Sequence, residues 1–169
     1  MIASEFINKW RGKKDSDGTP LVGIIVNWEN IKPDSKVIQL VDEQAWERIY
    51  DFTPPWYARE KRLPFRDFIK RRGQEYQSEI SMEKGKIERN KFEYIKKHGL
   101  TPPLSSRFVA FADLSGSKGA LGDGNHRFLA ADSLIQSKDI HRAKEIKGVE
   151  LDIICLQNFN EVIPFDPFV

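Results

Sequence analysis

The sequence predicts a single α/β domain, spanning residues 1–169, in which helices pack on a small mixed β-sheet. Two observations indicate the sheet: residues 149–156 alternate apolar side chains along an extended segment, and residues 107–113 form an apolar run before a Ser/Gly-rich turn. A third observation indicates helices, because residues 84–98 carry an apolar stripe at helical spacing and end at Gly99. A chain of this length buries a core without disulfides or a structural metal.

The N-terminal segment is expected to contribute one helix and one strand. Residues 1–12 place Ile2, Phe6, Ile7 and Trp10 on one helical side, and residues 13–20 are a loop by composition. Residues 21–26 (LVGIIV) are apolar on both faces and therefore predict an internal strand.

The middle of the chain is expected to be mostly helical and interrupted by proline. Apolar spacing predicts a helix from Val37 to Tyr50, which Pro54 and Pro55 follow. Residues 56–72 predict an aromatic-rich helical piece that restarts at Pro64.

The last third predicts a hairpin, a helix and a closing strand. Residues 101–103 form an extended connector, and residues 114–119 turn the chain from strand 107–113 into a short strand at 120–121. A helix then begins near residue 125, with one face that packs on the sheet: Phe128, Ala131, Leu134 and Ile135.

Charge and cysteine content exclude several classes of protein. The 27 basic and 25 acidic residues give a formal charge of +2, which does not indicate a nucleic-acid-binding protein. Cys155 is the single cysteine, so an internal disulfide and a multi-cysteine zinc site are excluded, and its apolar neighbours predict an inert buried thiol. Neither a signal peptide nor a membrane-spanning run is evident, so we expect a cytoplasmic protein with no membrane partner.

The segment Gly122-Asp123-Gly124-Asn125-His126-Arg127 carries the densest group of chemically able residues. It lies where a strand is expected to end and a helix to begin. Glycines let backbone N–H groups approach an anion, and a helix N-terminus adds partial positive charge. The segment therefore predicts a phosphate-binding junction.

Each polar side chain of this segment has a functional role open to it and a structural alternative. Arg127 is suited to clamp two phosphate oxygens, and His126 to hydrogen-bond a phosphate or act as an acid. Asp123 is the candidate to help hold Mg²⁺ or to position a nucleophile. The alternative is that Asp123 or Asn125 caps the helix, Arg127 forms a surface ion pair and His126 is a core histidine.

This segment, with the Phe-Leu-Ala-Ala that follows it, resembles the signature of the ParB/sulfiredoxin superfamily. In that family a glycine-rich strand end opens a helix and binds nucleotide phosphates. Residues 20–36 and 86–157 follow the family's order of elements, whereas residues 37–85 have no match and are expected to form a helical insertion. Asn125 stands where sulfiredoxins carry a reactive cysteine, so sulfinic-acid reduction is not expected. No helix-turn-helix follows, so a chromosome-segregation CTP clamp is not expected either.

The pattern is most similar to members with Asp-Gly-x-His-Arg, which include ATP- or ADP-dependent small-molecule kinases and short ATPases and DNases. The resemblance implies an enzyme that binds ATP or another nucleoside triphosphate with Mg²⁺ and hydrolyses it or transfers its phosphoryl group. In kinase-type relatives a carboxylate near the first strand serves as general base, which makes Glu29 a candidate; an exposed loop glutamate is the alternative. Lys32 or Lys36 could also reach the nucleotide.

Two other functions stay open from the sequence. One is a metal-dependent DNase, with the metal held by Asp123 and another carboxylate. The other is a non-enzymatic module that binds DNA or protein and senses a nucleotide. The nucleotide base, the phosphoryl acceptor and the oligomeric state are left open by the sequence.

Residues 58–72 form a basic stretch, with seven basic and two acidic side chains and interleaved aromatic rings. Such a mixture suits a nucleic-acid strand, because the charges follow the backbone and the rings stack on bases. The alternative is a solvated helix whose Phe65 and Phe68 pack inward. The candidate DNA contacts are Arg59, Lys61, Arg62, Arg66, Lys70, Arg71 and Arg72.

Overall fold

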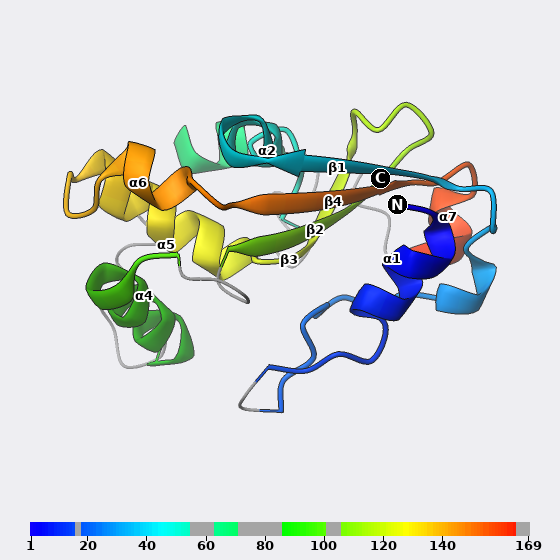
Figure 1. Ribbon diagram of the computed structural model, residues 1–169, viewed down its shortest axis with the longest axis horizontal. Coiled ribbons are helices and arrows are strands. Elements are labelled where there is room, and N and C mark those ends of the chain that lie inside the picture. The colour runs from blue at the N-terminus through cyan, green and yellow to red at the C-terminus, as the bar shows by residue number, and fades with distance from the viewer. Residues whose placement is uncertain (16–17, 55–62, 71–85, 101–105, 165–169) are drawn as a thin grey trace.

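The computed structural model describes residues 1–15, 18–54, 63–70, 86–100 and 106–164. These residues form a four-stranded mixed sheet with helices on both faces, so the α/β class and the mixed sheet expected from the sequence are confirmed (Figure 1).

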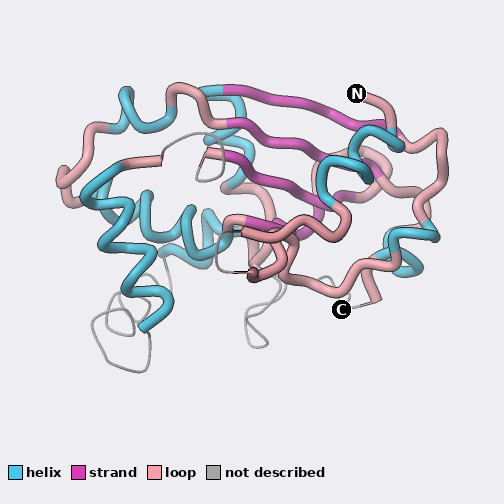
Figure 2. Tube along the Cα trace, turned by 60° about the horizontal axis from the view of Figure 1, so that its bottom comes forward, coloured by secondary structure: helices cyan, strands magenta, loops and turns pink. Residues whose placement is uncertain are grey.

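The sheet has the strand order β1-β4-β2-β3, and its strands lie side by side in Figure 2. The inner strand β4 (Glu150–Cys155) pairs antiparallel with β1 (Lys36–Val41) and parallel with β2 (Arg107–Ala112). The second edge strand, β3 (Gly119–Asp123), pairs antiparallel with β2. The predicted strands at 107–113 and 149–156 and the predicted hairpin are therefore confirmed.

The helices α2 (Asp42–Ile49), α4 (Lys86–His98), α5 (Asn125–Gln136) and α6 (Arg142–Ile146), with a helical segment at 65–70, contribute to one face, the α5 face. The other face, the α1 face, is covered by α1 (Ala3–Trp10), α7 (Phe159–Val162) and the 3₁₀ turn η1 (Trp28–Asn30). The predicted helices at 1–12 and 84–98 are confirmed over the described residues.

Each face has its own apolar core, because side chains alternate across the inner strands. On β2 and β4 the α5 face receives Phe108, Ala110, Ala112, Leu151, Ile153 and Cys155, and the α1 face receives Val109, Phe111 and Ile154. Cys155 is buried, and burial raises the pKa of its thiol, as expected for an inert cysteine.

The predicted strand at residues 21–26 is wrong. This run joins no strand of the sheet and instead lies against the α1 face, where Leu21, Val22, Ile24 and Val26 pack on the core. Ile25 is 74% exposed, and the Gly23 amide donates to the Gly122 carbonyl at 3.3 Å. The apolar residues are therefore used to cover a sheet rather than to extend one.

The predicted helix from Val37 to Tyr50 is wrong over its first turns. Residues 37–41 belong to β1, where Val37 lies opposite Ile154 and Leu40 opposite Leu151. Asp42, the first residue of α2, adopts a positive φ of 53° directly after the strand ends at Val41. The apolar spacing of this stretch fits both periods, and pairing with β4 decides between them.

The expected helical insertion at 37–85 is thus divided. Residues 37–53 contribute a strand of the sheet and the α2 cover, and Thr53 lies along the outer edge of β3, its amide bonded to the Gly119 carbonyl at 2.9 Å. Residues 55–62 and 71–85 of the insertion, and the connector at 101–103, lie outside the described residues. Within the part of the chain that is described, no helix has both the length and the apolar character needed to cross a bilayer.

Candidate phosphate-binding junction

The predicted strand-to-helix junction is confirmed: β3 ends at Asp123 and α5 begins at Asn125. Between them Gly124 has a φ of 96° and a ψ of 12°, a left-handed conformation that strains any residue with a side chain. A Cβ atom at this position would also lie 2.2 Å from Cδ1 of Phe108. Glycine is therefore required both by the backbone turn and by the ring beneath it.

Gly122 brings the strand close to a second ring. A Cβ atom here would lie 2.5 Å from Cε2 of Phe111, on the α1 face of the sheet. Both motif glycines thus have a packing reason to be glycine, independent of any ligand.

The N-cap residue of α5 contributes no side-chain cap. The cap residue is Gly124, which has no side-chain oxygen, and no side-chain cap hydrogen bond is formed there. Asn125 does not cap the helix, because its Nδ2 donates to the Leu121 carbonyl at 2.8 Å and its side chain is buried. A left-handed residue followed by helical residues orients successive backbone N–H groups around a concavity that suits an anion.

Arg127 and Asp123 form an ion pair, with Nη2 2.8 Å from Oδ2 and each side chain only 15% exposed. The same Nη2 donates to the Arg107 carbonyl at 2.9 Å, and the guanidinium lies 4.7 Å from the centre of the Phe108 ring. This pair is more enclosed than the surface ion pair considered above. A phosphate at the junction would have to share Arg127 with Asp123.

His126 is partly exposed in the first turn of α5, with its Nδ1 shielded from solvent. The structure therefore brings together the candidate phosphate-binding residues from Gly122 to Arg127 at one end of the sheet (Figure 1).

Glu29 lies elsewhere. It is exposed in η1, which is held beside α7: the Asn30 side chain donates to the Glu161 carbonyl at 3.0 Å, and the Asn27 amide donates to the Val162 carbonyl at 2.8 Å. In Figure 1 α7 and α5 lie toward opposite ends of the sheet. The structure thus does not bring Glu29 to the junction.

The two lysine candidates are likewise exposed and distant. Lys36 begins β1 opposite Cys155, at the end of the sheet remote from Asp123, and Lys32 lies in the turn before it.

The basic stretch is described only in part. Phe65 and Phe68 are fully buried, which is the inward packing considered as the alternative to base stacking. Arg66 is exposed but engaged, 3.3 Å from Asp51 and over the Tyr50 ring, and Lys70 is exposed. The other candidates lie outside the described residues: Arg59, Lys61, Arg62, Arg71 and Arg72.

Among the described residues, no group of three or more His, Cys, Asp or Glu side chains is arranged to hold a metal ion. The carboxylate of Asp123, the metal candidate expected from the sequence, is bound to Arg127.

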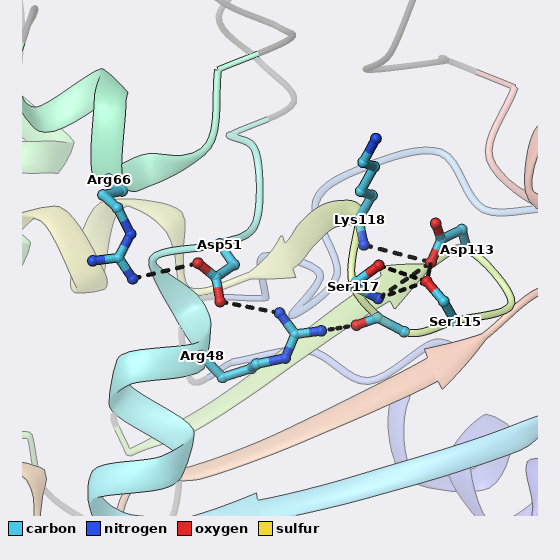
Figure 3. A network of polar contacts seen from close by, with 8 residues as sticks. Arg48, Asp51, Arg66, Asp113, Ser115, Ser117 and Lys118 are labelled. Carbon is cyan, nitrogen blue, oxygen red and sulfur yellow. Dashed lines mark hydrogen bonds and ion pairs between the residues drawn. The ribbon is translucent and has the colours of Figure 1, made fainter.

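A polar network at the hairpin turn was not anticipated from the sequence. Asp51 bridges Arg48 and Arg66, and Arg48 donates to the Gly116 carbonyl in the turn between β2 and β3 (Figure 3). Within the turn, the Asp113 carboxylate accepts hydrogen bonds from Ser115 Oγ and from the Ser117 and Lys118 amides. These contacts hold the turn against α2.

Two buried aspartates were also missed. Asp152 lies in the middle of β4 and Asp132 in α5, and both side chains are at most 3% exposed. An acidic residue inside an otherwise apolar run is the sequence signal that could have found both of them, because such a residue needs a partner when it is buried.

Comparisons with protein-family models, with curated proteins and with solved structures find no match to this chain.

Proposed function

We propose that this protein binds the phosphates of a nucleoside triphosphate at the junction between β3 and α5, and hydrolyses the nucleotide or transfers its phosphoryl group with Mg²⁺. The observation that carries the proposal is the left-handed Gly124 at the start of a twelve-residue helix, with Arg127 in the first turn. This arrangement combines backbone donors, helix dipole and a cation at one point.

The likeness of residues 122–127 to the ParB/sulfiredoxin signature supports the same proposal. The described fold has the corresponding local arrangement, since a glycine-rich strand end opens a helix that packs on a mixed sheet. In this proposal catalysis depends on positioning and charge neutralisation, with Asp123 and His126 as the groups nearest the phosphates.

A second candidate is nucleotide binding without turnover, as in a sensing module. The Asp123–Arg127 ion pair favours it, because a carboxylate held by an arginine at 2.8 Å is neutralised for metal binding and for proton abstraction. Under this alternative the phosphate competes with Asp123 for Arg127, and nucleotide binding changes the start of α5.

The test is Arg127→Ala, with binding of ATP, ADP, CTP and GTP measured by calorimetry in the presence of Mg²⁺. Loss of a charge-assisted hydrogen bond should weaken nucleotide binding by about 10- to 100-fold. The nucleotide affinity of Arg127→Lys should lie between those of the parent protein and Arg127→Ala, because lysine keeps the charge and loses the planar fork of the guanidinium.

Arg107→Ala is the matched control. Arg107 lies at the same end of the sheet, and its side chain is 41% exposed and pairs with Glu150 at 3.6 Å. It should bind nucleotide as the parent protein does. Undiminished binding by a folded Arg127→Ala variant would exclude the site.

Phosphate release then separates the two candidates. Release that depends on Mg²⁺ supports the enzyme, and tight binding without release supports the sensing module. DNA is a possible second ligand through the basic stretch, so the assay is run with and without it. Loss of DNA with Mg²⁺ but no nucleotide would instead support the nuclease alternative.

A further inference from the structure

Asp132 lies in a part of α5 that the proposed phosphate site does not use. It is 3% exposed, in the middle of the helix, and faces the apolar core between α5 and α2. The Tyr50 hydroxyl, at the C-terminal end of α2, donates a hydrogen bond to Oδ1 of Asp132, and Gln136 on α5 supplies a second hydrogen bond. A carboxyl group is thus enclosed between two helices with neutral donors.

The surroundings of this pair are aromatic. The Tyr50 ring packs edge-on against Phe128 at 4.8 Å and against Trp46 at 6.2 Å between ring centres. Trp46 and Phe128 are themselves fully buried. Such surroundings give an ionised carboxylate little solvation, so burial works against the charged form.

No cation compensates this carboxylate among the described residues. The Arg66 guanidinium lies over the Tyr50 ring at 5.5 Å, but it binds Asp51. Glu47 adds negative charge beside Tyr50. The other charged side chains described on the elements packed around α5 are engaged elsewhere or reach solvent: Glu43, Arg48, Asp67, Lys70, Glu93, Lys96, Lys97, His98, Arg142, Lys144 and Glu145.

We propose that Asp132, held by Tyr50 between α2 and α5, is a buried proton-binding site, so that burying this carboxyl between the two helices is most favourable in acid and becomes less favourable as pH rises. This proposal is independent of the proposed nucleotide site. It makes α5 a helix whose packing responds to pH.

The direction follows from linkage. Burial raises the pKa of Asp132, and the Tyr50 and Gln136 hydrogen bonds oppose that shift without cancelling it. The folded protein therefore holds this proton more tightly than the unfolded chain. The stabilisation is complete below the ordinary aspartate pKa of about 4 and is lost as pH rises through the folded pKa.

The direct experiment is a pH titration of the full chain labelled with ¹³C at aspartate carboxyl carbons, with the Asp132 signal assigned by its absence in Asp132→Asn. We expect a midpoint above the ordinary value of about 4. Tyr50→Phe should raise the midpoint further, because it removes a donor to the carboxylate. A midpoint at or below the ordinary value, or one that Tyr50→Phe leaves unchanged, would overturn the proposal.

Thermal unfolding gives a second measurement. Asp132→Asn keeps an oxygen that accepts the hydrogen bond from Tyr50, and it removes the charge. The melting temperature of this variant minus that of the parent should therefore increase as pH rises from about 4 to about 8. Asp139→Asn, which removes an exposed carboxylate just beyond the same helix, is the control, and its melting temperature should change with pH as that of the parent does. If the melting temperature of Asp132→Asn also follows that of the parent at every pH, Asp132 does not bind the proton.

Discussion

Within the described part of the chain, each face of the sheet buries one aspartate, and the two aspartates differ in the partners that meet their charge. On the α1 face, Asp152 forms an ion pair with Lys9 at 2.7 Å and accepts hydrogen bonds from the Trp10 indole at 3.0 Å and the Gln39 amide at 3.3 Å. On the α5 face, Asp132 is met by the neutral Tyr50 and Gln136. The two carboxylates are almost equally buried.

The difference in partners separates a carboxylate with a structural role from a carboxylate whose protonation depends on pH. A buried charge with a cation and two further donors is satisfied in its ionised form, and it ties α1 to β4 and β1. A buried carboxylate with only neutral donors is better satisfied when it carries a proton. Burial alone therefore does not identify a group that responds to pH, whereas the partners do.

The largest effect expected from this comparison is that of Asp152→Ala. The change leaves Lys9, Trp10 and Gln39 without their common acceptor, which should cost about 3 kcal/mol of unfolding free energy. Urea unfolding at neutral pH measures it. Asp132→Asn is the counterpart on the α5 face and should be neutral or stabilising at the same pH. Equal losses in the two variants would remove the distinction between the faces.

Lys9→Met sharpens the comparison, because it gives Asp152 the same kind of surroundings as Asp132. The carboxylate keeps the Trp10 and Gln39 donors and loses its cation, at a cost of roughly 2 kcal/mol. Chemical unfolding at neutral pH measures this loss, with Lys13→Met on the exposed loop as control. A stability equal to that of the parent would count against the role given to Lys9.

The sequence predicted an element correctly where its apolar spacing fits only one secondary structure. Residues 150–155 carry an apolar side chain at every second position on one face and lie inside the sheet, and residues 122–127 mark a strand end by composition alone. It failed where the apolar spacing fitted two structures, as at residues 37–41, or where an apolar run covers a sheet without joining it, as at residues 21–26. Those outcomes depend on pairing with distant strands, which no local pattern contains.

The candidate site shows the same division. Local sequence placed Gly124 and Arg127 together because they belong to one turn and the helix it opens. It could not place Glu29, whose position depends on contacts between η1 and α7, more than 125 residues apart in the chain. Nor could it foresee that Asp123 would be the partner of Arg127, since that depends on the left-handed turn between them.

The smallest expected effect concerns a third carboxylate, Asp113, which is only partly buried and accepts hydrogen bonds from neutral donors. Burial opposes the charged form of Asp113, but hydrogen bonds from Ser115 Oγ and the amides of the turn outweigh it and hold the pKa of this carboxyl below its usual value. A lowered folded pKa stabilises the fold above the ordinary value of about 4, and the stabilisation is lost as pH falls through the folded pKa. Asp113→Asn should therefore cost about 1 kcal/mol at neutral pH, and less in acid, by urea unfolding. The change in unfolding free energy caused by Asp113→Asn should therefore vary with pH in the opposite direction to that caused by Asp132→Asn. If both changes vary in the same direction, the partners of a carboxylate do not decide how its contribution to stability depends on pH.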